Sequence, residues 1–364
     1  MKRVCLFNFP DFDNPQGVEI RSFEWDRFFF TGSQGLGFLR FKKKWDTIQK
    51  KRAIVKGAEG VDHLYRSRDP QYMEMIKSFV ETFKDYDLIA MSTFNPIHPE
   101  VFSRYLPKPR KVLGFIDDPY STYLRGIPYL WAFDGAFYIS PSYSKSQLFA
   151  EALKQWGCQN SYWWPLSPQK FVLPEKSGDD FFRNRNRNVV YVGLPYATKV
   201  GRLISLRQAF GKSFEIYGKW PLRGYSAILG PLLGRKVLWQ KVNSLTFDEK
   251  TRIYWDTKIG FNMHLSESTV ETGNLRMYEV PAHGMMLLCD KAGRDAHELI
   301  FSSEEAVYYD DLEDAKRKIN YYLENNEDRI NIAKNGYRRF VKNYRFPENL
   351  CRFLEWAINL RKAG

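Results

Sequence analysis

The sequence predicts an α/β protein made of two doubly wound parallel-sheet domains in tandem, and two observations support this. Short apolar segments of strand length alternate with longer segments of helical periodicity, once in each half of the chain. Strands separated by helices are typical of parallel βαβ units. Between the two series, residues 165–188 are rich in Pro, Gly and alternating Arg and Asn, which is the composition of a linker.

The elements can be assigned in order along each half. In the first half, the expected strands are residues 4–9, 87–92, 111–116 and 135–140, and the expected helices include residues 71–84 and 143–156. In the second half, the expected strands are residues 189–192, 214–217, 259–264, 285–288 and 306–309. We therefore predict a first domain at residues 1–170 and a second domain at residues 186–345.

Amphipathic helices are expected at the end of the chain. Residues 312–324, 327–343 and 347–361 each carry apolar residues three and four positions apart, which gives every one of them an apolar face. We assign the last of these helices to a separate segment, residues 346–364.

Length and composition exclude several classes of protein. A chain of 364 residues exceeds one ordinary domain, and its 44% hydrophobic and 16% aromatic residues are too many for intrinsic disorder. No apolar run in the sequence approaches the roughly 20 residues that span a bilayer. The 4 cysteines are scattered and never occur as C-x-x-C, so neither a metal site nor a disulfide framework is predicted. We expect a cytoplasmic protein.

The chain is basic, and its charge is concentrated in segments. It has 55 Lys and Arg residues against 42 Asp and Glu residues, which gives a formal net charge of +13. Residues 181–241 hold 12 basic residues and one acid, and residues 40–56 hold 8 basic residues and one acid. Such segments create a positive potential that attracts phosphate on a small ligand, an anionic membrane or a nucleic acid.

The most informative segment begins with the strand expected at residues 259–264. Asn262 lies near the end of this strand, a polar loop follows, and a helix is expected to begin near Gly273 and Asn274. In open α/β sheets, ligands bind at the carboxyl ends of the strands, where helix N-termini offer free N–H groups to phosphate. The segment therefore predicts a site for a phosphorylated ligand. His264 and His283 are expected to pack near this site without a catalytic role.

Residues in this segment resemble a known family. Glu271 and Glu279 are separated by seven residues and precede an apolar strand, which resembles the E-x7-E signature of retaining, family 4-like glycosyltransferases with the GT-B fold. A closer similarity is to the CgeB-like (spore-maturation-protein-like) glycosyltransferases. Their second domain carries an Asn on a strand, an N-x-R-x-x-E segment and a later Gly, and here these positions are Asn262, residues 274–279 and Gly284.

The similarity covers most of residues 110–345. It includes the Tyr-Val-Gly-Leu-Pro-Tyr segment at residues 191–196, followed by Lys199 and Arg202, and the Tyr-Gly-Lys-Trp segment at residues 217–220. In the first half, residues 114–119 resemble the family's strand that ends in Asp-Asp-Pro.

The resemblance implies a fold and an activity. The fold is GT-B, with two Rossmann-like domains that face a cleft and a C-terminal helix that crosses back to the first domain. The activity is the transfer of a hexose or pentose from a nucleotide sugar to an acceptor hydroxyl, with retention of configuration and without a metal. UDP is the default nucleotide, because UDP-sugars are common donors.

The resemblance also implies roles for individual donor-binding residues. Glu279 accepts hydrogen bonds from the ribose hydroxyls, since a carboxylate suits a diol. Cationic side chains stabilise the leaving diphosphate as its charge develops. The candidates for that role are Arg276, Lys199 and Arg202. The remaining donor-binding residues implied by the family pattern are Gly193, Asn262, Gly273, Asn274 and Tyr278.

The catalytic candidates lie on both halves of the chain. Glu271 is placed beside the donor sugar, where it binds hydroxyls or supports positive charge at the anomeric carbon. Asp117 and Asp118 are placed on the acceptor side, where they orient the acceptor hydroxyl or take its proton.

The acceptor stays open between alternatives. Basic and aromatic residues together suit an anionic membrane, which favours a lipid-linked saccharide or another cell-envelope glycan precursor and a protein that associates with the inner membrane face. The same basic segments could follow the backbone of DNA, with a modified base as the acceptor. A third alternative is a non-catalytic protein that binds nucleic acid or glycan on the same scaffold.

Overall fold

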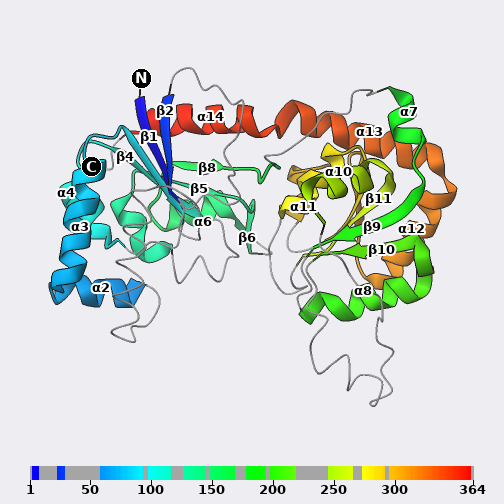
Figure 1. The fold of residues 1–364 in the computed structure, drawn as a ribbon, viewed down its shortest axis with the longest axis horizontal. Coiled ribbons are helices and arrows are strands. Elements are labelled where there is room, and N and C mark those ends of the chain that lie inside the picture. Colours follow the sequence, from blue (N-terminus) through cyan, green and yellow to red (C-terminus); the bar gives the residue numbers. More distant parts are fainter. Residues whose placement is uncertain are drawn as a thin grey trace, which may run out of the picture. The chain divides into compact units, whose positions relative to one another are not determined.

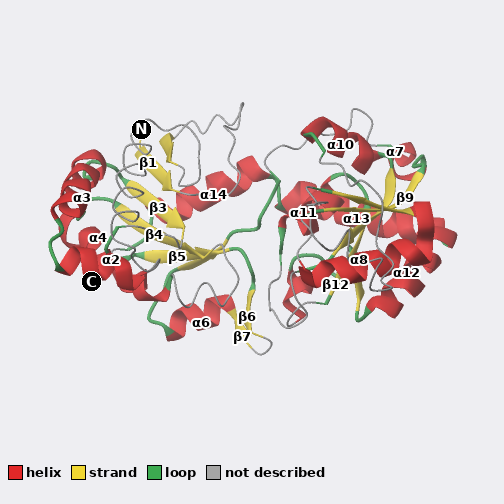
Figure 2. Cartoon of the chain, turned by 60° about the horizontal axis from the view of Figure 1, so that its bottom comes forward, coloured by secondary structure: helices red, strands yellow, loops and turns green. Residues whose placement is uncertain are grey.

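A computed structural model of the chain describes residues 2–7, 23–28, 58–92, 97–115, 126–144, 147–168, 178–193, 197–218, 245–264, 273–291 and 295–361. The chain divides into two compact units. Unit 1 consists of Met1–Pro165 and Phe346–Gly364, and unit 2 consists of Leu166–Arg345. Each unit contains a parallel sheet flanked by helices (Figures 1 and 2). The predicted fold class, two α/β parallel-sheet domains, is confirmed.

The sheet of unit 1 has the strand order β2-β1-β3-β4-β5-β8, and all neighbouring strands in it are parallel. Its strands are β1 (Lys2–Phe7), β2 (Phe23–Phe28), β3 (Leu88–Ser92), β4 (Arg110–Phe115), β5 (Gly135–Tyr138) and β8 (Ser161–Trp163). A small antiparallel pair is formed by β6 (Ser142–Ser144) and β7 (Gln147–Leu148). The sequence did not indicate β2 or β8, which are the two edge strands.

Both faces of this sheet are covered. Alternate residues of β1 point to opposite faces, and Cys5 belongs to one buried cluster while Val4 and Leu6 belong to another. The first cluster includes residues of α2 (Ala58–Arg66), α3 (Pro70–Phe83), α4 (Pro99–Tyr105), the 3₁₀ helix η1 (Ile127–Ala132) and α6 (Phe149–Gln155). The second cluster is closed by the C-terminal helix α14 (Phe346–Ile358), where Phe353 packs edge-on against Phe137 at 5.3 Å between ring centroids.

The sheet of unit 2 has the strand order β10-β9-β11-β12-β13 and is also parallel. Its strands are β9 (Arg187–Val192), β10 (Phe214–Tyr217), β11 (Thr257–Asn262), β12 (Met286–Asp290) and β13 (Val307–Tyr309). Its helices include α7 (Asp179–Arg183), α8 (Ala197–Phe210), α10 (Phe247–Trp255), α11 (Leu275–Ala282), α12 (Leu312–Glu324) and α13 (Asn326–Asn343). All five strands expected in the second half of the sequence are present.

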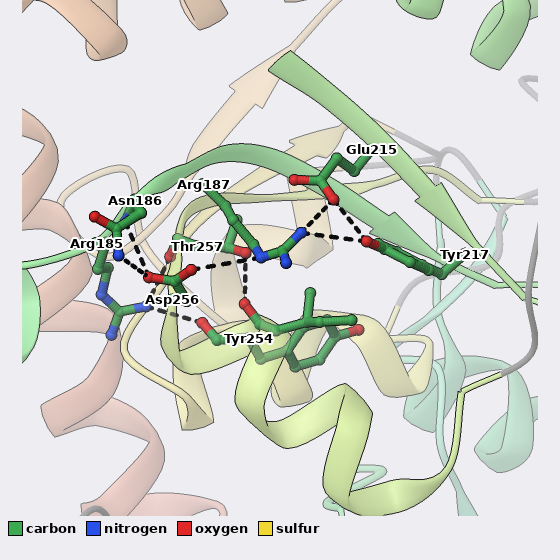
Figure 3. Close-up of polar contacts among 9 residues, drawn as sticks. Arg185, Asn186, Arg187, Glu215, Tyr217, Tyr254, Asp256 and Thr257 are labelled. Carbon is green, nitrogen blue, oxygen red and sulfur yellow. Dashed lines mark hydrogen bonds and ion pairs between the residues drawn. The ribbon is translucent and has the colours of Figure 1, made fainter. Parts of the chain in front are cut away.

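A buried arginine joins several of these elements at the start of β9. Arg185 is 4% exposed, and its guanidinium donates to the carbonyl oxygens of Phe181 (3.0 Å), Tyr254 (3.0 Å), Thr257 (2.7 Å) and His283 (2.9 Å). Figure 3 shows this arginine beside Tyr254 and Thr257. The carbonyls of Tyr254 and His283 lie at the C-terminal ends of α10 and α11, where a positive charge is favourable.

The surroundings of Arg185 affect its pKa and also require a glycine at the nearby position 284. Burial lowers the pKa of Arg185 to about 9, which leaves it protonated at neutral pH. Gly284 follows α11 at φ +69°, and a Cβ there would come within 2.4 Å of the Phe181 ring and 2.8 Å of Arg185 Nη2. Only glycine allows this backbone and this close approach.

A second cluster of polar residues, centred on Arg187, lies beside Arg185 in Figure 3. Arg187 pairs with Glu215, with Asp256 at 3.5 Å and with the Tyr217 hydroxyl at 3.2 Å. Asp256 also accepts hydrogen bonds from the backbone and side-chain nitrogens of Asn186 at 3.0 and 2.8 Å. The amino ends of β9 and β11 are therefore held by polar contacts on the edge of the sheet opposite to the one where ligands bind in such folds.

Replacement of Arg185 by Met tests the importance of this group for stability. We expect the free energy of unfolding, measured by urea denaturation, to fall by about 4 kcal/mol, because the substitution removes a buried cation together with its carbonyl hydrogen bonds. Arg183→Met is the matched control, since Arg183 is exposed and pairs with the exposed Glu327. Equal losses in the two variants would contradict the assignment.

Candidate functional site

Three neighbouring strands of the sheet of unit 2 end at the same edge. Val192, Asn262 and Asp290 are the last residues of β9, β11 and β12, and β11 lies between the other two strands. Because these strands are parallel, their carboxyl ends meet at the same edge, which is where α/β folds bind ligands. Most of the described donor-binding candidates surround this edge.

Arg276, near the start of α11, ties two of the strand ends together. Its Nε donates to the carbonyl oxygen of Val192 at 2.7 Å, and its Nη1 donates to Asn262 Oδ1 at 2.7 Å. The guanidinium stacks over the Tyr191 ring, with Cζ 4.3 Å from the centroid. A Cβ on Gly193 would come within 2.2 Å of the remaining nitrogen, Nη2, so this glycine makes room for the guanidinium.

Asn262 links the same edge to two further strands. Its side chain is fully buried, and its Nδ2 donates to Cys289 Sγ at 3.2 Å while Oδ1 accepts from Arg276. Its carbonyl oxygen accepts a hydrogen bond from the Tyr309 hydroxyl at 3.0 Å. The structure therefore brings together the predicted residues Asn262, Arg276 and Gly193.

The N-terminus of α11 is built by the two residues in front of it. Gly273 adopts φ +82°, and Asn274 caps the helix by accepting from the backbone N–H of Met277 at 3.3 Å. A helix N-terminus carries unpaired N–H groups and a partial positive charge. This end of α11 therefore adds to the positive potential of Arg276.

Glu279 lies on the same helix and is neutralised by a lysine that the sequence analysis missed. Its Oε1 is 2.6 Å from Lys250 Nζ on α10, and the two side chains are 11% and 22% exposed. The two residues are 29 positions apart, and no pattern in the linear sequence connects them.

Lys199 and Arg202 lie in the first turns of α8, the helix that follows β9. Lys199 is almost fully buried, at 6% exposed. Burial raises the pKa of Tyr309 well above its usual value, and the charge of Arg202 acts in the opposite direction. Arg202 therefore lies close enough to affect the hydroxyl that bonds Asn262.

Tyr278 lies apart from the other predicted donor-binding residues. Its side chain is fully buried, with its ring centroid 5.2 Å from that of Tyr344 and 6.2 Å from that of Phe301. Successive helix residues differ by about 100° in direction, so a neighbour of Glu279 faces elsewhere. Tyr278 therefore packs α11 against Phe301 and Tyr344.

Other predicted features lie outside the described residues. These are the catalytic candidates Glu271, Asp117 and Asp118, the basic segment 40–56 and, within the basic segment 181–241, the aromatic-rich part at residues 219–241. Within the parts of the chain that the structure does describe, the helices are too short or too polar to cross a lipid bilayer.

His283 fixes the other end of α11. Its Nδ1 donates to the carbonyl oxygen of Glu279 at 2.7 Å, and its ring lies edge-on to Tyr254 at 5.2 Å. Burial lowers the pKa of His283 to about 4, so the ring is neutral at pH 7. The helix that carries Arg276 and Glu279 is thus held at both ends.

Comparison with known proteins identified one family model and several solved structures with a similar fold. Residues 202–355 match the model of a family described as glycosyl transferase-like. The sequence matches none of the curated proteins. An alpha-glucosyltransferase in complex with UDP-glucose and DNA containing an abasic site has a TM-score of 0.60 at 10% identity, over 98% of this chain and 99% of that chain.

Two further solved structures have the same architecture. Sucrose-phosphate synthase from Thermosynechococcus elongatus has a TM-score of 0.58 at 13% identity, with 98% of each chain covered. Anabaena HepE in complex with UDP has a TM-score of 0.57 at 13% identity, over 98% of this chain and 99% of that chain. The likeness shows that the chain has the GT-B fold predicted from the sequence.

The buried His283 predicts a pH dependence of stability. In the unfolded chain the ring takes up a proton below about pH 6.5, whereas in the folded chain it does so only near pH 4. The unfolded state therefore binds more protons between these values. The stability that the neutral ring contributes is complete above pH 6.5, and we expect about 3 kcal/mol of it to be lost as the pH falls toward 4.

His283→Asn isolates this contribution, because the amide keeps a donor near the position of Nδ1 and does not titrate. Urea denaturation between pH 4 and 7 should give a smaller loss of unfolding free energy for the variant than for the wild type. Parallel curves for the two proteins would show that His283 is not responsible.

Proposed function

We propose that the chain is a glycosyltransferase that moves a sugar from a nucleotide-sugar donor to an acceptor hydroxyl, with the donor bound at the strand ends of unit 2. The observation that carries the proposal is the linked set of Arg276, Asn262 and Gly193, with Glu279 on the same helix. The match to the glycosyl transferase-like model includes β11 and α11 entirely. The similar structures with UDP or UDP-glucose bound support a nucleotide-sugar donor.

The proposed donor contacts follow from the chemistry of a nucleoside diphosphate sugar. The Glu279 carboxylate accepts from the ribose hydroxyls while Lys250 limits the cost of its partial burial. The diphosphate faces Arg276 Nη2, the N-terminus of α11 and the cations Lys199 and Arg202. A UDP-sugar is the default donor, and the sugar is a hexose or a pentose.

In the transfer step, the bond between the anomeric carbon and the diphosphate oxygen breaks, and its electron pair leaves with the diphosphate. The acceptor oxygen forms the new bond to that carbon and gives its proton to Asp117 or Asp118. Cations and helix N–H groups stabilise the charge on the leaving group, a role that a metal plays elsewhere. We propose retention of configuration, with Glu271 beside the sugar and Asp117 or Asp118 beside the acceptor hydroxyl.

A nucleotide screen tests the donor site. Isothermal titration with UDP, GDP, ADP, CMP and dTDP, with and without Mg²⁺, should find one nucleotide that binds without metal, and this ligand should raise the melting temperature by mass action. Glu279→Ala should weaken its binding at least tenfold, because a ribose contact is lost. Glu324→Ala, which changes an exposed acid on α12, should bind the nucleotide as the wild type does.

Two results would contradict the donor site. Unchanged nucleotide binding in Glu279→Ala would show that the ribose is held elsewhere. An absence of binding to every nucleotide, together with salt-sensitive binding of DNA, would favour a non-catalytic protein on this scaffold.

We propose a cell-envelope glycan precursor as the acceptor, with the basic segments 40–56 and 219–241 in contact with an anionic membrane. DNA is the second candidate, since the net charge is +13 and one similar structure contains DNA. We expect the protein to sediment with vesicles that contain anionic lipid and to bind duplex DNA only weakly. A DNA affinity that falls by about a thousandfold between 50 and 200 mM salt would favour DNA over the glycan precursor as the acceptor.

A further inference from the structure

A buried histidine and aspartate pair lies at the same edge of the sheet as Arg276. His264 follows β11 by two residues, and Asp290 is the last residue of the neighbouring β12. The two residues are 1% and 7% exposed. Asp290 Oδ1 lies 2.7 Å from His264 Nδ1, and the carboxylate also accepts from the backbone N–H of His264, at 2.9 Å to Oδ2 and 3.2 Å to Oδ1.

The charge state of Asp290 fixes the proton on the ring. Burial acts to raise the pKa of Asp290, but the charge and hydrogen bonds of His264 outweigh this effect and leave the pKa below its usual value. The carboxylate is therefore ionised and can only accept hydrogen bonds. His264 Nδ1 must carry the proton in that bond, which leaves Nε2 as the free end of the ring.

Among the residues that the structure describes, this second nitrogen has no hydrogen-bond partner, and it is shielded from water. A buried polar atom without a partner destabilises the folded state. The neighbouring Asn262, by contrast, uses its side-chain amide and carbonyl oxygen in bonds to Cys289 and Arg276. A buried polar atom without a partner calls for an explanation, and a ligand at this sheet edge would supply the missing partner.

The surroundings indicate an anionic ligand. Asn262 joins Arg276 to Cys289, which is adjacent to Asp290 in the chain. The charge of Arg276 reaches this group, because it counters in part the rise that burial causes in the pKa of Cys289. The carboxylate of Asp290 is already paired with His264. The charge that remains at this edge of the sheet is therefore positive and comes from cations.

We propose that His264 donates a hydrogen bond from Nε2–H to the diphosphate of the nucleotide-sugar donor, with Asp290 as the residue that positions the ring. The inference rests on the proposed function and adds a residue to its donor site. The ring then lies between the Asp290 carboxylate and a phosphate oxygen. Water is excluded from this nitrogen, and hydrogen bonds to an anion are strong in such surroundings.

A metal ion is the alternative occupant, since the ligand atoms of His264, Cys289 and Asp290 lie within 4.8 Å of one another. Metals bind the thiolate form of cysteine. Burial raises the pKa of the Cys289 thiol well above its usual value, so a metal would first have to displace a buried proton. The His264 and Asp290 atoms are also closed in a hydrogen bond of their own. The observations therefore favour a phosphate over a metal.

The test compares UDP with uridine by isothermal titration. His264→Asn places an amide near the position of Nδ1, keeps a partner for Asp290 and removes the outer donor. We expect its affinity for UDP to fall at least tenfold, while its affinity for uridine stays within threefold of the wild type. His264→Gln, whose amide reaches toward the position of Nε2, should recover part of the UDP affinity. His63→Asn changes an exposed histidine of unit 1 and should bind both ligands normally.

Several outcomes would overturn the inference. Unchanged UDP affinity in His264→Asn, or an equal loss for UDP and uridine, would show that the ring does not contact the diphosphate. One equivalent of a transition metal in the purified wild type, absent from His264→Asn, would assign the group to a metal. If the wild type binds UDP and Glu279→Ala does not, a normal His264→Asn overturns this inference alone. A wild type that binds no nucleotide overturns the proposed function as well.

Discussion

The buried guanidinium of Arg185 is the interaction on which unit 2 depends. It carries a positive charge into the interior and satisfies it with carbonyl oxygens from α7, α10, α11 and the start of β11. An ion without such partners would be too costly to bury. Because the acceptors come from separate parts of the chain, their positions around the first residues of β9 are fixed together, and Gly284 is required so that the chain can pass this group.

Helix α11 connects the Arg185 group to the opposite edge of the sheet. Arg185 and His283 hold the C-terminal end of this helix, while Arg276 ties its first turn to Val192 and Asn262. The groups that face the proposed donor are therefore held in place before any ligand arrives. Such preorganisation is what makes fixed charges effective on a leaving group, since the protein does not need to reorganise during the reaction.

The proposed site balances charge within itself. Glu279 is paired with Lys250, and Asp290 is paired with His264, so both buried acids have cationic or hydrogen-bonding partners. Arg276 bonds only neutral oxygens among the described residues, and its charge is left for a ligand. In a structural ion-pair network, the charges of the cations and the acids would cancel. At this edge, by contrast, the acids are paired and Arg276 has no acid partner among the described residues. This arrangement also explains why the sheet edge suits an anion.

The sequence by itself determined the fold class, the central strands and the segment that carries the proposed site, because buried parallel strands are apolar along their whole length and helices repeat every 3.6 residues. Its resemblance to a known family also indicated Asn262, Arg276 and Glu279, which lie on one strand and the helix after it. It did not reveal β2 and β8, since an edge strand pairs on one side only and needs less apolar sequence. Lys250, the bond between His264 and Asp290, and the inward packing of Tyr278 were decided by the tertiary structure alone. Each depends on which residues meet across 20 or more positions of chain, and local periodicity contains no information about such contacts.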